Sequence, residues 1–147
     1  MKKLATLLVV FALLLTSGVA IALDGSVTST TTWVSGQKFK VVKYHWVAST
    51  LSVTPYANLE SPDGLVYGFI TDPGTTAPED NYDIYLKDYV TGVSLTGTTL
   101  ENRDTTNSEL VVPTVPIPFY GNVGFSLSGN ANLESTGDVY LYVRPLP

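Results

Sequence analysis

Carboxylates are the side chains in this sequence whose spacing could do chemistry. Asp72, Glu79, Asp80 and Asp83 follow one another in a single polar stretch. Carboxylate oxygens are ligands that Ca²⁺ prefers, so these four residues are the candidate calcium ligands. Their spacing does not follow the D-x-D-x-D-G order of an EF-hand, and a solvated acidic loop is the interpretation that the pattern favours.

Catalysis by a nucleophile or by an acid–base pair has few candidate residues. His45 is the single histidine, and a triad would need it beside an activated serine. The sequence has no G-x-S-x-G string, and the nearest match, residues 124–128, lies in a weak strand pattern. Asp80 and Asp83 would suit glycoside hydrolysis only in a cleft that sets their separation, whereas loop carboxylates more often cap backbone amides. We therefore predict that the chain is not an enzyme.

Cofactor and nucleic-acid binding are also disfavoured by composition. The chain has no cysteine and one histidine, which excludes the usual zinc ligand sets, so calcium is the one metal considered and no cofactor is expected. Without Lys2 and Lys3 the chain keeps six basic and thirteen acidic residues, a net charge of about −7. Nucleic-acid affinity rests on neutralising phosphates, so we expect no nucleic-acid partner.

Aromatic residues are more numerous than one small core can use. The chain has nine Tyr, five Phe and two Trp, and Tyr and Trp are enriched at protein interfaces. A platform for stacking sugars, and half-buried Tyr that simply covers a sheet, are the alternatives. The residues predicted to form an interface are Tyr44, Trp46, Tyr85, Tyr140 and Tyr142.

The elements that must position these residues are β-strands. Residues 65–71 form an apolar run of β-formers, and residues 82–88 alternate between apolar and polar. Between them, Asp72-Pro73-Gly74-Thr75 has the residues of a type II turn, with Gly74 free to take positive φ. We expect the two runs to pair as an antiparallel hairpin. Residues 38–47 are apolar on both faces, which is typical of a central or interface strand.

Other strand patterns occupy most of the remaining chain, and no convincing helix follows residue 23. About eight strands at regular spacing predict an all-β fold, a single antiparallel β-sandwich or a jelly-roll-like barrel. The segment 114–119 carries three prolines nearby and is expected to be an extended edge or crossover. The further strands are expected at 27–34, 51–54, 109–112, 121–128 and 138–144.

The N-terminal segment has the pattern of a signal peptide. Lys2-Lys3 precedes an apolar run from residue 4 to residue 15, and Ala20-Ile21-Ala22 has the small-x-small form of a cleavage site. We expect residues 1–22 to be removed, leaving an exported single domain at 23–147. A retained membrane anchor is the alternative, since about 20 residues can span a bilayer. Contact with a membrane is expected only through this segment, and only where it is not cleaved.

Several of these features resemble a known group of proteins. The stretch Asp72-Pro73-Gly74, then Pro78 and residues 80–84, resembles small, mostly uncharacterised β-rich virion-associated proteins of tailed bacteriophages and prophages. Further points of resemblance are Asp88, Leu95, Asn102-Arg103, Glu109, the strand motif Tyr44-His45-Trp46 and the closing strand 139–144.

The resemblance implies a non-enzymatic structural protein of the virion, a capsid decoration or head-associated protein. It also implies capsid or other virion proteins as partners, and it favours a homo-trimer because three-fold positions are common for capsid decoration. The sequence itself indicates a homo-oligomer without choosing its symmetry. The alternative function is a secreted or cell-surface carbohydrate-binding or adhesion module. The signal-like segment departs from what a virion protein needs and points instead to an exported prophage product.

Overall fold

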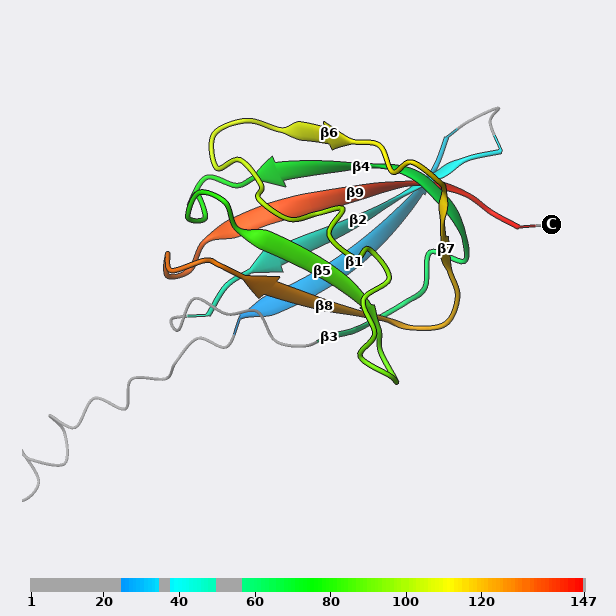
Figure 1. Cartoon of the computed structure of the whole chain (residues 1–147), viewed down its shortest axis with the longest axis horizontal. Coiled ribbons are helices and arrows are strands. Elements are labelled where there is room, and N and C mark those ends of the chain that lie inside the picture. Colours follow the sequence, from blue (N-terminus) through cyan, green and yellow to red (C-terminus); the bar gives the residue numbers. More distant parts are fainter. Residues whose placement is uncertain (1–24, 35–37, 50–56, 147) are drawn as a thin grey trace, which may run out of the picture.

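The computed structural model describes residues 25–34, 38–49 and 57–146, and these form two antiparallel β-sheets packed face to face (Figure 1). No helix occurs in these described ranges. The predicted all-β sandwich is confirmed, and the sheets stay open rather than closing into a barrel. The strands are β1 (Ser26–Trp33), β2 (Lys40–Val47), β3 (Ala57–Leu59), β4 (Gly64–Pro73), β5 (Asp83–Asp88), β6 (Glu109–Val111), β7 (Ile117–Phe119), β8 (Val123–Ser128) and β9 (Thr136–Arg144).

The larger sheet has six strands in the order β1-β2-β9-β4-β6, with β7 also paired to β4. The smaller sheet has the order β3-β8-β5. The last strand of the chain, β9, lies at the centre of the larger sheet between β2 and β4. Its alternation explains this place, because Val139, Leu141 and Val143 are buried against the other sheet.

The expected hairpin between residues 65–71 and 82–88 is wrong. β4 pairs with β9 on one side and with β6 and β7 on the other, so neither of its edges is left for β5. Instead, β5 pairs with β8 in the opposite sheet. The connection at 74–82 therefore crosses from one layer of the sandwich to the other.

The expected type II turn is also wrong, because β4 runs on through Pro73. Gly74 does not have positive φ. Its amide donates a hydrogen bond to the carbonyl of Thr136 at 2.8 Å, and a Cβ at this position would lie 2.0 Å from Thr136 Oγ1. Glycine is required here because the backbone segments at 74 and 136 lie very close together, and not because of turn geometry.

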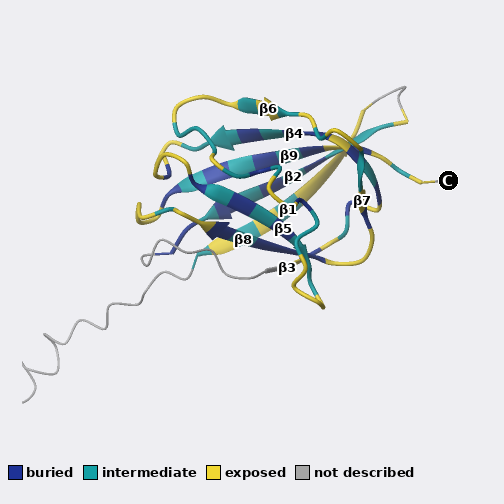
Figure 2. Cartoon of the chain, in the orientation of Figure 1, coloured by how far each residue is buried: buried dark blue, intermediate teal, exposed yellow. Residues whose placement is uncertain are grey.

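The core is built around large aromatic side chains, and Figure 2 shows the buried residues in dark blue along the strands of both sheets. The rings of Trp46 and Tyr82 pack with their centroids 5.9 Å apart. Gly137 lies directly under Trp46, since a Cβ there would be 2.5 Å from the indole. Tyr44 and Trp46 have no exposed surface, so their assignment to an interface is wrong: this face of β2 packs on the smaller sheet.

Most expected strands are present with shifted ends. The edge strand expected at 27–34 is β1, and the strands expected at 109–112, 121–128 and 138–144 are β6, β8 and β9. The short strand expected at 51–54 and the signal-like segment 1–22 lie outside the described residues. Within the described part of the chain, no helix is long and apolar enough to cross a membrane.

Candidate interaction face

One face of the larger sheet packs on the smaller sheet, and the other is not covered by any described element (Figure 1). We call this second surface the interaction face. On β2 and β9 the buried residues alternate with half-buried or exposed ones, which therefore point to the interaction face. These outward residues are Val41, Lys43, His45, Val47, Asp138, Tyr140, Tyr142 and Arg144.

A charged cluster occupies the middle of the interaction face. Asp138 lies opposite His45, and Tyr140 lies opposite Lys43, in the register of β2 and β9. Lys43 Nζ is 2.7 Å from Asp138 Oδ2, and His45 Nδ1 is 2.7 Å from Asp138 Oδ1. The Tyr140 hydroxyl donates a hydrogen bond to Asp138 Oδ2 at 3.2 Å, and the Lys43 ammonium lies over the Tyr140 ring. Three neighbours thus share one carboxylate.

The pKa values in this cluster follow from those contacts. Partial burial opposes ionisation of Asp138, but hydrogen bonds from Lys43 and His45 outweigh it and hold the pKa of Asp138 below its ordinary value. The hydrogen bond to Asp138 raises the pKa of Lys43, and burial beside Asp138 raises the pKa of Tyr140. Asp138 and Lys43 are therefore both ionised at neutral pH, whereas the Tyr140 hydroxyl keeps its proton.

A His–Asp pair provides two members of a catalytic triad, and the third would be a nucleophile hydrogen-bonded to His45. The neighbour of His45 on the far side is Thr28 of β1, and no hydrogen bond joins His45 to a hydroxyl within the described residues. A nucleophile activated by His45 would need such a contact. The arrangement holds a charged patch in place and has the groups to bind a polar ligand.

An apolar band lies beside the charged cluster on the same face. Tyr142 is opposite Gly68, at a bulge that also turns Tyr67 outward, and both tyrosines are 38% exposed. Leu110 of β6 is opposite Ile70 and is 68% exposed. At the end of the band, Phe39 and Tyr67 meet edge to face with their ring centroids 6.0 Å apart, and Val112 also remains exposed. Contiguous exposed apolar groups mark interaction surfaces.

The other predicted interface residues are divided among different places. Tyr140 and Tyr142 lie on the interaction face, whereas Tyr85 belongs to β5 on the outside of the smaller sheet. The Tyr85 hydroxyl donates to Glu101 Oε1 at 3.1 Å, and Lys87 lies over its ring. Tyr85 therefore cannot share one patch with Tyr140 and Tyr142.

The four candidate calcium ligands do not converge. Asp72 accepts a hydrogen bond from the Ser108 hydroxyl at 2.6 Å, and Glu79 accepts one from the amide of Ala131 at 2.9 Å. Asp83 accepts one from the amide of Asn102 at 3.0 Å. Asp80 is exposed, and the described residues hold no group of three or more His, Asp or Glu side chains suited to a metal ion. The candidate ligands are therefore separated, because each bound carboxylate fastens a different loop.

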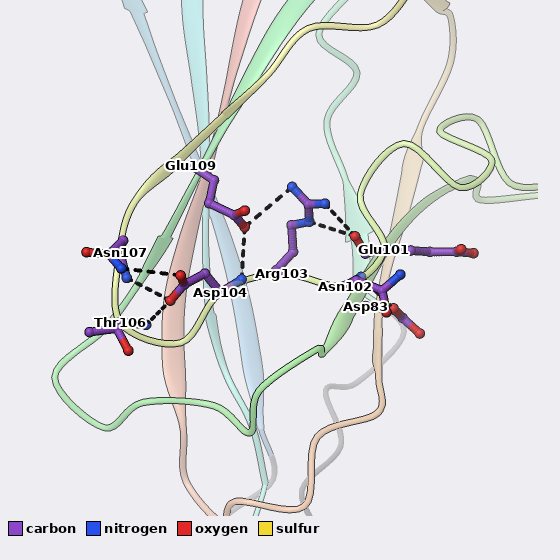
Figure 3. Close-up of polar contacts among 8 residues, drawn as sticks. All are labelled: Asp83, Glu101, Asn102, Arg103, Asp104, Thr106, Asn107 and Glu109. Atoms are coloured by element: carbon purple, nitrogen blue, oxygen red, sulfur yellow. Dashed lines mark hydrogen bonds and ion pairs between the residues drawn. The ribbon is translucent and has the colours of Figure 1, made fainter.

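A polar network that the sequence did not reveal closes one side of the sandwich (Figure 3). Arg103 lies 3.4 Å from Glu109 and also donates to the carbonyl of Glu101. Glu109 in turn accepts from the amide of Asp104, whose carboxylate accepts from the amide of Asn107. These contacts hold the segment between β5 and β6 against the body, and the side chain of Leu100 from this segment is buried in the core.

This segment also depends on unusual backbone geometry. Asn102 and Asn81 have positive φ, a conformation that Asn adopts more readily than most residues. Their neighbours pair: the amide of Asn81 donates to the carbonyl of Arg103, and the amide of Arg103 donates to the carbonyl of Tyr82. Asn residues next to charged ones were the available sequence signal for this closure.

The chain was compared with protein-family models, curated proteins and solved structures, and nothing in any of the three matches it.

Proposed function

We propose that this chain is a non-enzymatic structural protein that binds a partner through the interaction face. The observation that supports this most directly is the apolar band on the uncovered side of the six-stranded sheet. Leu110 and Val112 are more than half exposed there, and two half-exposed tyrosines lie nearby. Covering such a band would gain about 25 cal/mol per Å² of apolar surface. Its charged neighbour, the Lys43–Asp138–His45 cluster, would fix orientation.

The partner that we propose is another protein of a phage or prophage particle. The sequence resemblance supports this class of partner, and the small all-β domain with one uncovered sheet face is compatible with a capsid decoration or head-associated role. Export through the N-terminal segment remains part of the proposal. If the chain is exported, the form of the proposal that fits is a product released from a prophage. A trimeric assembly is supported by the resemblance alone.

Mass spectrometry of particles purified from the producing host tests this proposal. We expect peptides of the chain to co-purify with the particles, and we expect Leu110→Ser together with Tyr142→Ala to lower incorporation at least about tenfold, since each buried apolar side chain contributes about 1.5–3 kcal/mol. Val90→Ser is the matched control, because Val90 is 87% exposed in a turn outside the interaction face. Absence from particles, or equal incorporation of both variants, would contradict the proposal.

A carbohydrate-binding or adhesion module is the second candidate, and one observation favours it. Tyr67 precedes Gly68 on β4 and Tyr142 lies opposite Gly68 on β9, so two half-exposed aromatic rings flank this position. Lys43 and His45, on the same face, have donor atoms beyond those that Asp138 uses. Rings beside fixed polar groups suit a sugar, which has an apolar face and hydroxyl edges.

A glycan array separates the two candidates. The carbohydrate proposal expects binding to one class of glycan that Tyr142→Ala abolishes and that the matched substitution Tyr85→Ala, on the opposite side of the sandwich, leaves unchanged. A chain that binds no glycan but enters particles supports the first candidate. Binding that survives Tyr142→Ala would contradict a sugar site at Gly68.

A further inference from the structure

The first strand of the domain, β1, forms one edge of the six-stranded sheet. It pairs with β2 over all eight residues from Ser26↔Val47 to Trp33↔Lys40, and no other described strand pairs with it. Its sequence, Ser-Val-Thr-Ser-Thr-Thr-Thr-Trp, consists of strand-forming and small polar residues. Alternate backbone amide and carbonyl groups along β1 therefore face outward from the sheet.

The remaining sheet edges carry the features by which proteins prevent strands from pairing with other chains. β6 and β7 are three residues long, with Pro113 following β6 and Pro118 within β7. β5 carries Asp83, Lys87 and Asp88, and β3 has three residues. Short length, proline and charge all discourage edge pairing. β1 has none of these, and its register with β2 contains no bulge.

We propose that β1 pairs antiparallel with β1 of a second copy of this chain across a two-fold axis. The charge pattern argues for this occupant. In a two-fold pair the residues near the axis face their own copies, and like charges placed opposite each other are destabilising. The chain as a whole is acidic, yet Ser26–Trp33 contains no charged residue. β1 can therefore lie opposite a copy of itself without bringing like charges together, whereas β5 carries three charged residues.

The sheet geometry narrows the register of this pair. The two-fold axis must stand perpendicular to the sheet to keep the two interaction faces on the same side. Residues that face each other across the two strands point to the same side of the sheet, so their numbers differ by an even number. The two-fold axis therefore passes between one residue and the same residue of the second copy. An axis at Thr30 places Thr28 opposite Thr32, and Val27 opposite Trp33, of the other copy. Thr–Thr and aromatic–β-branched pairs are favourable in antiparallel sheets, and Trp33 is 62% exposed without a partner copy.

The result is one continuous sheet across both copies, with the two interaction faces joined side by side. This inference does not rest on the proposed function, because it concerns the edge of the sheet and not its face. It predicts two-fold symmetry, whereas the sequence resemblance favours a trimer. A particle protein or a sugar-binding protein could each dimerise in this way.

Disulfide trapping gives the first test, because the chain has no cysteine of its own. In the full chain, in the form that its host releases, we expect Thr30→Cys to form a disulfide-linked dimer under mild oxidation, seen on a non-reducing gel and reversed by reductant. Cβ atoms of residues directly opposite in an antiparallel pair are about 4.5–5.5 Å apart, close to disulfide geometry. Val90→Cys is the control for random collision, since Val90 is 87% exposed and lies in a turn outside β1.

A charge substitution gives the second test. Thr30 lies opposite Lys43 within one copy, so Thr30→Glu gains an opposite charge there, while across the two-fold axis it brings two carboxylates together. By light scattering at tens of micromolar, we expect the unchanged chain to have twice the protomer mass and Thr30→Glu to have the protomer mass. Val90→Glu adds the same charge elsewhere and is expected to remain a dimer.

Three outcomes would overturn the proposal: a monomeric unchanged chain, an oligomer whose mass Thr30→Glu does not alter, or Thr30→Cys crosslinking no faster than Val90→Cys. If Thr30→Glu fails to fold by circular dichroism, the crosslinking rates decide. Loss of the dimer with particle incorporation or glycan binding retained would separate this inference from the proposed function.

Discussion

Tyr82 carries a polar atom that the fold buries without a partner. Its side chain has no exposed surface and packs on Trp46, and its hydroxyl makes no hydrogen bond within the described residues. Burial, with the nearby Glu109 carboxylate, raises the pKa of Tyr82. A buried hydroxyl without a partner costs about 1–3 kcal/mol, so this residue contributes its ring and not its polar end.

We therefore expect Tyr82→Phe to raise the free energy of unfolding by about 1 kcal/mol in urea titrations at neutral pH. Tyr44→Phe is the matched control, because Tyr44 is equally buried but its hydroxyl donates to the carbonyl of Glu60. Removing that bond should be neutral or slightly destabilising. A loss of stability in Tyr82→Phe equal to that in Tyr44→Phe would mean that the Tyr82 hydroxyl has an undetected partner.

The same pair of variants gives a pH dependence. A tyrosine whose pKa is raised by folding contributes stability that is present below the unfolded pKa of about 10 and is lost as the pH rises above it. The unchanged chain should therefore lose stability above about pH 10, where the unfolded state ionises and the folded state does not. Tyr82→Phe should lose less over that range, as measured by urea titrations at pH 8 and pH 10.5. Identical slopes would contradict a raised pKa at Tyr82.

At the scale of single residues, the sequence indicated which residues share a strand face, but it did not indicate whether that face is buried. Tyr44 and Trp46 alternate with Lys43 and His45, so the pattern established that they share a face but not whether that face is core or surface. This face is buried because Gly137 on the neighbouring strand β9 has no side chain and leaves room for the Trp46 indole. Carboxylates raised the opposite difficulty, since closeness in the sequence around Asp80 did not bring them together in the fold.

At the scale of elements, the segment between β5 and β6 acts as a closing strap. Asp83 at the start of β5 accepts hydrogen bonds from the amide of Asn102 and from the Ser128 hydroxyl. It therefore links this segment to two strands of the smaller sheet. Arg103 and Glu109 fasten the same segment toward the larger sheet (Figure 3).

We expect Asp83→Ala to lower the free energy of unfolding by about 1–2 kcal/mol and to speed hydrogen exchange at Asn102 and its neighbours first. Asp80→Ala is the matched control, because it removes the same charge from an exposed side chain three positions before β5. It should change neither quantity measurably. Equal effects of the two substitutions would show that charge, and not the hydrogen bonds of Asp83, stabilises the strap.

Strand positions were largely predictable, whereas strand partners were not. The alternation in Thr136–Arg144 and in Lys40–Val47 follows from local sequence. The partner of β4 is chosen by the distant β9, whose buried face matches that of β4 along almost its whole length. A local turn signal at Pro73-Gly74 cannot compete with that burial, which is why the expected hairpin failed.

At the scale of the whole molecule, β9 completes the centre of the fold. β9 pairs with β2 on one side and with β4 on the other, so the larger sheet has no continuous core without this strand. Pairings between segments far apart in sequence also make folding slow, in the range of milliseconds to seconds for β-sandwiches.

Removal of residues 136–147 should therefore leave the chain unfolded rather than merely weakened. It deletes the buried side chains of Val139, Leu141 and Val143 and exposes the facing edges of β2 and β4, a loss of about 1.5–3 kcal/mol for each side chain alone, against a total stability of about 5–15 kcal/mol for a domain. The expected signs are the loss of the near-ultraviolet circular dichroism of the buried aromatic residues and a red-shifted emission from Trp46. Removal of residues 146–147, beyond the end of β9, is the control and should preserve both signals. A truncated chain that keeps a cooperative urea transition would contradict this prediction. It would mean that β1, β2 and β4 form a stable sheet without β9.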